Sequence, residues 1–395
     1  MLGEAEPVFA TEATVERCGR ETELLRYCLE TRMLTKNELG ATVAKYVKEG
    51  CEDDLTVSRR EFIDGMGVLA ASSIIAPSPL RFRPVRVGEQ MKPEELRARL
   101  RGVIAFPVTP LKPDLSLDIP GLRKNLQHLL KHAPAAIVAA GGTGEMYSLT
   151  PAEHLEVVKA TVEEVHGQIP VIASTGFNWR IAVELTQQSE QVGADAILAL
   201  PPYYPNADEQ GLAEYYAAIG RATPLGMLVY SRDWVNPEPA WVEHLAAKIP
   251  TLVCWKDGQG DLRRYERIMN RVGDRLYWIG GAGDDSVPGY YSIGIRTYTS
   301  SIATFAPKLS LKLHEVAAAG DSSSLMQLMN TYVIPLYELR ARRKGYEVSV
   351  MKEAMNLIGM AAGPVRPPLP SLRPEEVREL QVMLERWKPF LSYQT

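Results

Sequence analysis

The chain has 395 residues, of which 46% are hydrophobic, and its formal net charge at pH 7 is −4. This length accommodates one large domain and a smaller part, with enough apolar side chains for a substantial core. Lysine and arginine are scattered without a basic run interleaved with aromatics, which excludes a nucleic-acid footprint, and no apolar run reaches the ~20 residues of a membrane span.

Residues 1–95 differ in kind from the rest, and we predict a helical or disordered N-terminal extension there. Residues 12–50 are polar and helix-prone and show no strand pattern. Residues 58–79 contain paired arginines, an aromatic, a mild apolar stretch and two prolines, and they resemble a twin-arginine export signal. Such signals normally start near the N-terminus, and Asp64 interrupts the edge of the apolar stretch. A translation start near Leu55 would explain the position of this segment, and the alternative to an export signal is an ordinary amphipathic helix.

From about Arg101, short apolar runs alternate with longer segments of helical spacing. The predicted strands are Val103–Pro107, Ala136–Ala140, Val171–Ser174, Ala196–Leu200, Met227–Tyr230, Leu252–Trp255, Leu276–Ile279 and Thr297–Ser301. The predicted helices between them are Ile119–His132, Pro151–His166, Arg180–Val192, Glu209–Ala222, Pro237–Lys248 and Leu262–Val272.

This alternation favours an α/β fold, a (β/α)8 TIM barrel over residues 96–306, because a parallel connection between strands needs a crossover. An open doubly wound sheet is the alternative, but the glycine-rich dinucleotide fingerprint that usually follows its first strand is missing.

Three or four further helices are predicted in the C-terminal region, residues 307–395. They are Leu309–Ala319, Ser322–Arg343, Val348–Gly359 and Pro374–Trp387. A minimal barrel needs fewer helices, so we expect the surplus to pack on one side of the barrel or to form a subunit contact.

Lys256 is the leading catalytic candidate, because it ends an apolar run that begins at Thr251 and is followed by Asp257 and Gly258. Burial disfavours the charged amine. A lysine whose pKa falls several units below about 10.4 is neutral near physiological pH and can attack a ketone to form a Schiff base. The alternative is a strand-end lysine that pairs with Asp257 or points to water.

Other polar and glycine residues follow the predicted strands, at the end where TIM barrels place their active sites. The Gly141–Gly144 turn can offer backbone N–H groups to the carboxylate of a 2-oxo acid, with the Thr143 hydroxyl as a further donor. Tyr230 ends the strand before that of Lys256 and is placed to transfer protons to Schiff-base intermediates. Gly281 leaves room for substrate. The alternatives are a glycine turn without a ligand and a core tyrosine.

The segment from Gly102 onward resembles the dihydrodipicolinate synthase and N-acetylneuraminate lyase superfamily of Schiff-base barrel enzymes, and within it the 5-dehydro-4-deoxyglucarate dehydratases. The shared stretches are Ala105–Pro110, Gly141–Glu145, Lys256–Asp261, Tyr298–Pro307, Pro335–Arg340 and Gly363–Arg366. The last three, and Gly142 in place of the Thr or Ser that synthases and lyases usually carry, are shared with the dehydratases in particular.

The resemblance implies that Lys256 forms an imine with the 2-oxo group and that Tyr230 shuttles protons. Ser300 and Ser301 occupy the positions of the family's paired serine, where one would contact the distal part of the substrate. The substrate-binding residues indicated by the resemblance and by the strand ends are Gly142, Thr143, Ser300, Ser301 and Gly281.

The implied reaction is loss of water and carbon dioxide from 5-dehydro-4-deoxyglucarate, or a related 2-oxo sugar acid, to give 2,5-dioxopentanoate. No cofactor and no metal are needed, because the lysine supplies the electrophilic catalysis. The four cysteines match no zinc or redox spacing, and the six histidines fall in helix-like segments, so the residues themselves also predict no metal site.

Two loops depart from the dehydratase pattern. Ser231 replaces an asparagine at the start of loop 231–234, and loop 282–286 replaces Leu-Pro-Thr-Ala-Glu. We therefore expect an intact catalytic core, whereas the loops that would contact the substrate have diverged.

Two alternatives stay open: a pyruvate-dependent class I aldolase of the synthase or lyase type, and a binding protein without turnover. The family further implies a homo-oligomer, dimer or tetramer, and a cytoplasmic location unless the twin-arginine-like segment directs export to the periplasm.

Overall fold

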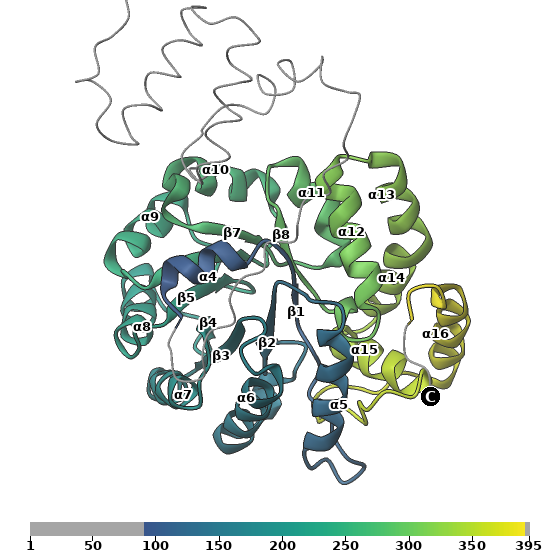
Figure 1. The fold of residues 1–395 in the computed structure, drawn as a ribbon. Coiled ribbons are helices and arrows are strands. Elements are labelled where there is room, and N and C mark those ends of the chain that lie inside the picture. Colours follow the sequence, from purple (N-terminus) through teal and green to yellow (C-terminus); the bar gives the residue numbers. More distant parts are fainter. Residues whose placement is uncertain (1–90, 392–395) are drawn as a thin grey trace, which may run out of the picture. The chain divides into compact units, whose positions relative to one another are not determined.

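The computed structural model describes residues 91–391, in which eight parallel strands close into a barrel in chain order (Figure 1). The strands are β1 (Gly102–Ala105), β2 (Ala136–Ala139), β3 (Val171–Phe177), β4 (Ala196–Pro202), β5 (Gly226–Ser231), β6 (Leu252–Asp257), β7 (Tyr277–Gly280) and β8 (Thr297–Ser300). The predicted TIM barrel and all eight strands are confirmed. The twin-arginine-like segment at 58–79 lies outside the described residues.

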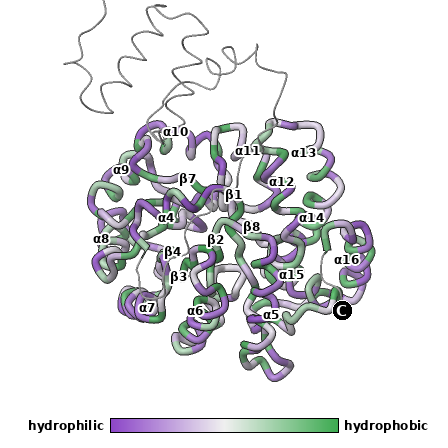
Figure 2. Tube along the Cα trace, in the orientation of Figure 1, coloured by the Kyte–Doolittle hydropathy of each residue, from purple (hydrophilic) through white to green (hydrophobic). Residues whose placement is uncertain are grey.

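Helices surround the barrel, and hydrophilic and hydrophobic residues alternate along them (Figure 2). They are α5 (Ile119–Leu130), α6 (Pro151–Val165), α7 (Trp179–Gln191), α8 (Glu209–Arg221), α9 (Pro239–Lys248), α10 (Leu262–Val272), α11 (Val287–Ser292) and α12 (Pro307–Ala319). The start of α6 shows why these segments are helical: Thr150 accepts from the N–H of Glu153, whose side chain returns to Thr150, and Pro151 occupies the first helical position.

The C-terminal helices lie together on one side of the barrel (Figure 1). They are α13 (Ser322–Leu328), α14 (Ile334–Ala341), α15 (Tyr346–Leu357) and α16 (Pro374–Trp387). The sequence predicts one helix over Ser322–Arg343, whereas the structure has a π-helical turn at Met329–Val333. Pro335 follows that turn, and since proline lacks an N–H and crowds the preceding turn, the regular ladder cannot continue there. Among the described residues, no helix has the length and apolar character to cross a membrane.

Within residues 91–391 the structure also has four short 3-10 segments. They are Met146–Ser148, Gly273–Arg275, Asp284–Ser286 and Ile302–Thr304. Three of the four lie in the loops that follow β2, β7 and β8, at the carboxyl end of the barrel.

Helix α4 (Pro93–Arg99) was not predicted, and it closes the amino end of the barrel. Figure 1 shows it crossing the ring of strands. Leu96 and Leu100 are fully buried and pack with inward side chains of the strands, including Ile104 and Cys254. Pro93 at the first turn was the available signal.

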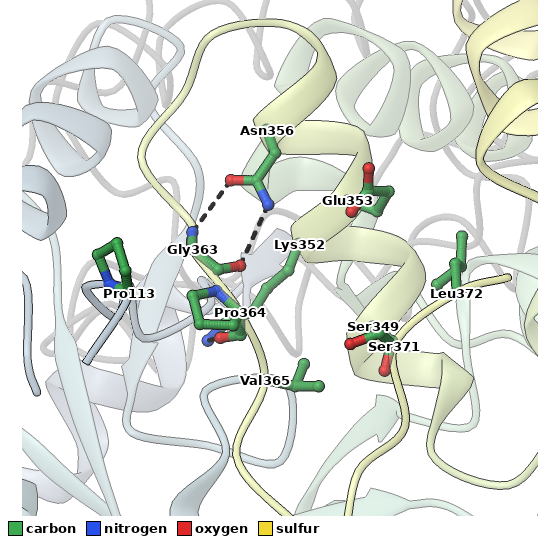
Figure 3. A pocket seen from close by; sticks show the side chains of 10 residues that line it. All are labelled: Pro113, Ser349, Lys352, Glu353, Asn356, Gly363, Pro364, Val365, Ser371 and Leu372. Carbon is green, nitrogen blue, oxygen red and sulfur yellow. Dashed lines mark hydrogen bonds between the residues drawn. The ribbon is translucent and has the colours of Figure 1, made fainter. Parts of the chain in front are cut away.

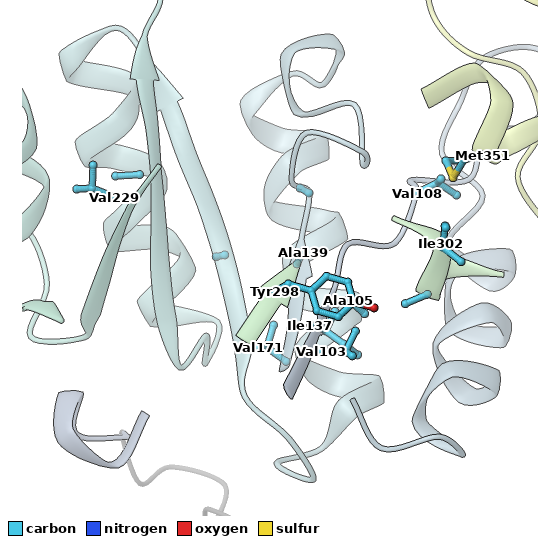
Figure 4. Close-up of a cluster of buried hydrophobic side chains, with 14 of the residues drawn as sticks. Val103, Ala105, Val108, Ile137, Ala139, Val171, Val229, Tyr298, Ile302 and Met351 are labelled. Atoms are coloured by element: carbon cyan, nitrogen blue, oxygen red, sulfur yellow. The ribbon is translucent and has the colours of Figure 1, made fainter. Parts of the chain in front are cut away.

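Side chains of the strands alternate between two apolar layers. Val103 and Ala105 pack outward against the helices, in the cluster drawn in Figure 4. Ile104 and Phe106 pack inside the barrel. This period of two, which every strand imposes, also decides which polar side chains at the strand ends enter the barrel.

The segment after α15 is fastened to the loop after β1. Leu111 donates its N–H to the carbonyl of Ala362 at 3.0 Å. Gly363 follows with φ +66°, and a Cβ built on it would lie 1.7 Å from the Leu111 carbonyl oxygen. A side chain is therefore excluded there by contact as well as by backbone conformation.

We expect Gly363→Ala to lower the free energy of unfolding by about 3 kcal/mol, the sum of a left-handed non-glycine residue and overpacking. Gly320→Ala is the matched control, because Gly320 has φ +73° but nothing within 4 Å of a built Cβ, and it should cost about 1 kcal/mol. Denaturant unfolding of both variants measures the difference. Equal losses would show that the contact with Leu111 is readily relieved.

Candidate active site

Lys256 lies inside the carboxyl end of the barrel. Trp255 packs outward with the helices, so the alternation along β6 turns Lys256 inward, where it is 2% exposed. Its Nζ is 2.9 Å from the carbonyl oxygen of Gly281, 3.0 Å from the centroid of the Tyr230 ring and 5.3 Å from that of Phe106. Burial, together with the nearby positive charge of Arg232, lowers the pKa of Lys256 well below its ordinary value of 10.5.

Tyr230 is brought to Lys256 by the strand register, which pairs the two residues directly across β5 and β6. Its hydroxyl donates to the same Gly281 carbonyl oxygen at 3.1 Å. Burial raises the pKa of Tyr230 to about 12, so the phenol keeps its proton at neutral pH. The Gly281 carbonyl oxygen is thus hydrogen-bonded to both the Lys256 amine and the Tyr230 hydroxyl, which keeps the two groups adjacent.

Asp257 does not form an ion pair with Lys256, which was the alternative that the sequence left open. Its carboxylate accepts from the Tyr290 hydroxyl at 2.7 Å and from the backbone N–H groups of Gln259 and Gly260, each at 3.1 Å. Neighbouring residues on a strand point to opposite faces, so Asp257 is directed away from the amine. The Lys256 amine is therefore hydrogen-bonded to a backbone oxygen and not to this carboxylate.

Gly281 is needed for its lack of a side chain. A Cβ built on it would lie 2.5 Å from Lys256 Nζ and 2.4 Å from the Asp257 carbonyl oxygen. The sequence predicts that Gly281 leaves room for substrate. The structure gives it a further use, since its carbonyl could not approach the amine so closely if the residue carried a side chain.

The loop after β2 carries the predicted carboxylate-binding residues Gly142 and Thr143. The loop is held by the Thr109 hydroxyl, which donates to the Gly144 carbonyl at 2.6 Å. Thr143 is partly buried on this loop, and its role as a further donor to the carboxylate stays a prediction. A Cβ built on Gly142 would lie 3.2 Å from Nη1 of Arg232, which brings the loops after β2 and β5 together.

Ser300 and Ser301 lie at the end of β8, and both hydroxyls have partners within the protein. Ser300 donates to the fully buried carboxylate of Asp284, which also accepts from the Tyr337 hydroxyl at 2.9 Å. The Ser301 hydroxyl accepts from Arg340 Nη1 at 3.1 Å. The role of these serines in substrate contact stays a prediction. Asp284, which belongs to the diverged loop 282–286, points into the protein.

A buried ion pair, which the sequence analysis missed, anchors the same glycine loop to the C-terminal helices. Glu145 closes the loop and pairs with Lys352 of α15, and both side chains are almost fully buried. Lys352 Nζ also donates to the carbonyl of Pro364 at 2.8 Å, while Arg366 donates its backbone N–H to Glu145 at 3.0 Å. The shared stretch Gly363–Arg366 was the available signal, but spacing alone does not reveal its partner.

A cavity of about 470 Å³ lies beside this ion pair (Figure 3). Helix α15 and the segments after it supply most of its lining, and Asn356 spans its edge through two hydrogen bonds with Gly363, at 3.0 and 3.1 Å. None of the predicted catalytic or substrate-binding residues lines it. Across residues 91–391, no group of three or more His, Cys, Asp or Glu side chains is arranged to hold a metal ion.

Residues 99–387 match the Dihydrodipicolinate synthetase family. A protein of Bradyrhizobium diazoefficiens named "Probable 5-dehydro-4-deoxyglucarate dehydratase" is 38% identical over 77% of this chain and 98% of its own length. A protein of Ralstonia nicotianae with the same name is 42% identical over 72% of this chain and 92% of its own length.

Solved structures agree with this match. A dihydrodipicolinate synthase from Oceanobacillus iheyensis superposes with a TM-score of 0.71 at 29% identity, covering 75% of this chain and 99% of the synthase. A prophage protein of the dihydrodipicolinic acid synthase family from E. coli K12, solved in complex with pyruvate, has a TM-score of 0.68 at 25% identity and covers 73% and 98%.

The lowered pKa of Lys256 predicts the pH dependence of imine formation. Only the neutral amine attacks a ketone, so trapping of Lys256 with pyruvate and cyanoborohydride should rise with pH and level off well below the ordinary lysine value of 10.5. Intact-mass measurement across a pH series gives the inflection, with Nα-acetyl-lysine treated identically as the control. An inflection that coincides with that of the free amino acid would contradict the burial argument.

We expect Lys352→Met to destabilise the fold by about 3–5 kcal/mol, because it leaves Glu145 buried without a counter-ion. The double variant Glu145→Gln, Lys352→Met removes both charges and should recover most of the loss. Denaturant unfolding of the two variants measures this. If the double variant is as unstable as the single one, the loss comes from packing and not from an unpaired charge.

Proposed function

The chain belongs to the Dihydrodipicolinate synthetase family, and on this premise we propose that it is a Schiff-base lyase that dehydrates and decarboxylates 5-dehydro-4-deoxyglucarate, or a related 2-oxo sugar acid, to 2,5-dioxopentanoate. The observation that carries this proposal is the buried Lys256 amine, which shares the Gly281 carbonyl with the Tyr230 hydroxyl. The names of the relatives support the choice of substrate. The reaction belongs to sugar acid catabolism.

The dehydration uses the imine as an electron sink. Lys256 Nζ attacks the oxo carbon, and the carbinolamine loses water to give an imine that is protonated on nitrogen. A proton then leaves the neighbouring methylene carbon, and its electron pair forms an enamine. The enamine expels the hydroxyl group on the next carbon as water, which leaves a carbon–carbon double bond conjugated with the imine.

The decarboxylation uses the same conjugated system. The distal carboxylate departs as carbon dioxide, and the electron pair of the broken bond moves through the double bond toward the imine nitrogen. Protonation on carbon, conversion of the resulting enol to an aldehyde and hydrolysis of the imine release 2,5-dioxopentanoate and the free lysine. The net change is loss of one water and one carbon dioxide, without oxidation or reduction of the enzyme.

Residue roles follow from the contacts. The phenol of Tyr230 is protonated in the resting site and lies beside Nζ, so it can protonate the leaving oxygen and take the proton back. Gly142, Thr143, Ser300, Ser301 and Gly281 are the proposed substrate-binding residues. The lysine supplies the electron sink, so the proposal needs no organic cofactor and no metal, and it retains the family expectation of a dimer or tetramer.

The first experiment is incubation with 5-dehydro-4-deoxyglucarate and borohydride, with intact mass and carbon dioxide recorded together. An adduct on Lys256 with carbon dioxide release supports the proposal. An adduct without carbon dioxide, combined with release of pyruvate from other sugar acids, would favour the aldolase. Binding of sugar acids without any product would favour a binding protein.

Two variants test the assigned roles. Lys256→Ala should abolish the adduct, and Tyr230→Phe should slow turnover by roughly 10²-fold or more while leaving trapping intact, the scale expected of a positioned acid–base group. Steady-state rates and intact masses measure the two effects. Normal turnover in either variant would remove that residue from the mechanism.

A further inference from the structure

The guanidinium of Arg232 lies against the Tyr230 ring. Arg232 follows β5, and its central carbon is 5.4 Å from the centroid of the Tyr230 ring. Two of its nitrogens are occupied by the adjacent carboxylate: Nε donates to Asp233 at 2.8 Å, and Nη2 donates to the other oxygen at 3.4 Å. Nη1 forms no hydrogen bond with any residue of the range 91–391, so one donor-bearing nitrogen remains for a ligand.

That nitrogen faces the glycine loop after β2. A Cβ on Gly142 would lie 3.2 Å from Nη1, closer than most side-chain contacts, so the guanidinium takes the space where a larger residue at this position would stand. Glycine at position 142 is therefore matched to arginine at position 232. Nη1 of Arg232 and the glycine loop that carries Thr143 are therefore neighbours.

The positive charge of Arg232 favours an anionic ligand at this place. Lys256 has no carboxylate partner, because Asp257 is bonded to Tyr290 and to backbone N–H groups. The positive charge of Arg232, which pairs with Asp233 at one edge, disfavours the charged form of Lys256. Once Lys256 has become a protonated imine, a carboxylate on the imine carbon would offset that charge and could accept a charge-assisted hydrogen bond from Arg232.

We propose that Arg232 binds, through Nη1, the carboxylate attached to the imine carbon, and so makes the site selective for 2-oxo acids over uncharged ketones. This inference rests on the imine formation in the proposed function. A cation held against the carboxylate that departs would stabilise its charge and oppose decarboxylation. The carboxylate next to the imine keeps its charge throughout, so a charge-assisted bond from Nη1 to it carries no such penalty.

A purely structural role for Arg232 is the competing explanation. Its bonds to Asp233 and its place over Tyr230 could serve only to order the turn after β5. That role would change imine formation equally for charged and uncharged ketones, whereas a carboxylate-binding role changes their ratio.

The test compares trapping of Lys256 by pyruvate and by methyl pyruvate, in the presence of cyanoborohydride, for the full chain and for Arg232→Met. The two ketones share the same reacting carbon, so effects of the substitution on the pKa of Lys256 cancel in the ratio of their trapping efficiencies. Arg232→Met should lower the preference for pyruvate by about 10- to 100-fold, the range of a charge-assisted hydrogen bond, and Arg232→Lys should restore part of it.

Controls make either outcome decisive. Arg271→Met is the matched control, because Arg271 also pairs with a carboxylate, that of Glu243, at the far end of α10, and the ratio should not change. An unchanged ratio in Arg232→Met with Lys256 still trapped overturns the inference. If Arg232→Met does not fold, Arg232→Gln and Arg232→Lys decide by the same ratio.

Failure of the proposed function would be distinct from failure of this inference. Trapping by pyruvate requires only an imine, so an absence of carbon dioxide release from the sugar acid leaves the ratio measurable. If Lys256 forms no adduct at all, the proposed function fails. Calorimetric titration with pyruvate and with methyl pyruvate then tests Arg232 directly: loss of the pyruvate preference in Arg232→Met supports its role, and an unchanged preference overturns it.

Discussion

Lys256 can hold an uncharged amine because the closed barrel removes it from water on every side. Its strand neighbours face outward into the helices, and its own side chain ends between the rings of Tyr230 and Phe106. Asp257 forms no ion pair with it, because that carboxylate is directed away and bonded to Tyr290, so the effect of burial outweighs the attraction of the Asp257 charge. Desolvation therefore favours the neutral amine, and the chemistry that the family performs begins from that form.

The site also depends on a backbone carbonyl that comes close to the side chains of Lys256 and Tyr230. The Gly281 carbonyl reaches both reactive side chains because no Cβ keeps it away. Gly142 has a comparable part on the opposite side, where its missing side chain admits Arg232. Gly281 thus determines how near a backbone oxygen comes to the amine, and Gly142 how near a cation comes to the glycine loop.

The C-terminal helices do more than cover the barrel. Lys352 of α15 neutralises Glu145, the last residue of the glycine loop, and Arg366 donates to the Ser148 carbonyl at 2.7 Å and pairs with Glu153 at the start of α6. The glycine loop is therefore held from outside the barrel. Gly363 permits this arrangement, because the segment passes in contact with the Leu111 carbonyl.

The sequence by itself determined the strands, the barrel and the pair Lys256 and Tyr230, because the period of two and the order of strands are local properties that also specify which residues end neighbouring strands. Helix α4 was missed because a short helix whose apolar face meets a barrel end has no pattern of its own beyond one turn. Only the tertiary structure decided that Asp257 avoids Lys256, that Glu145 pairs with Lys352, and that Arg232 meets Gly142. Each of these depends on side-chain direction and on contacts between loops distant in sequence, which residue spacing does not encode.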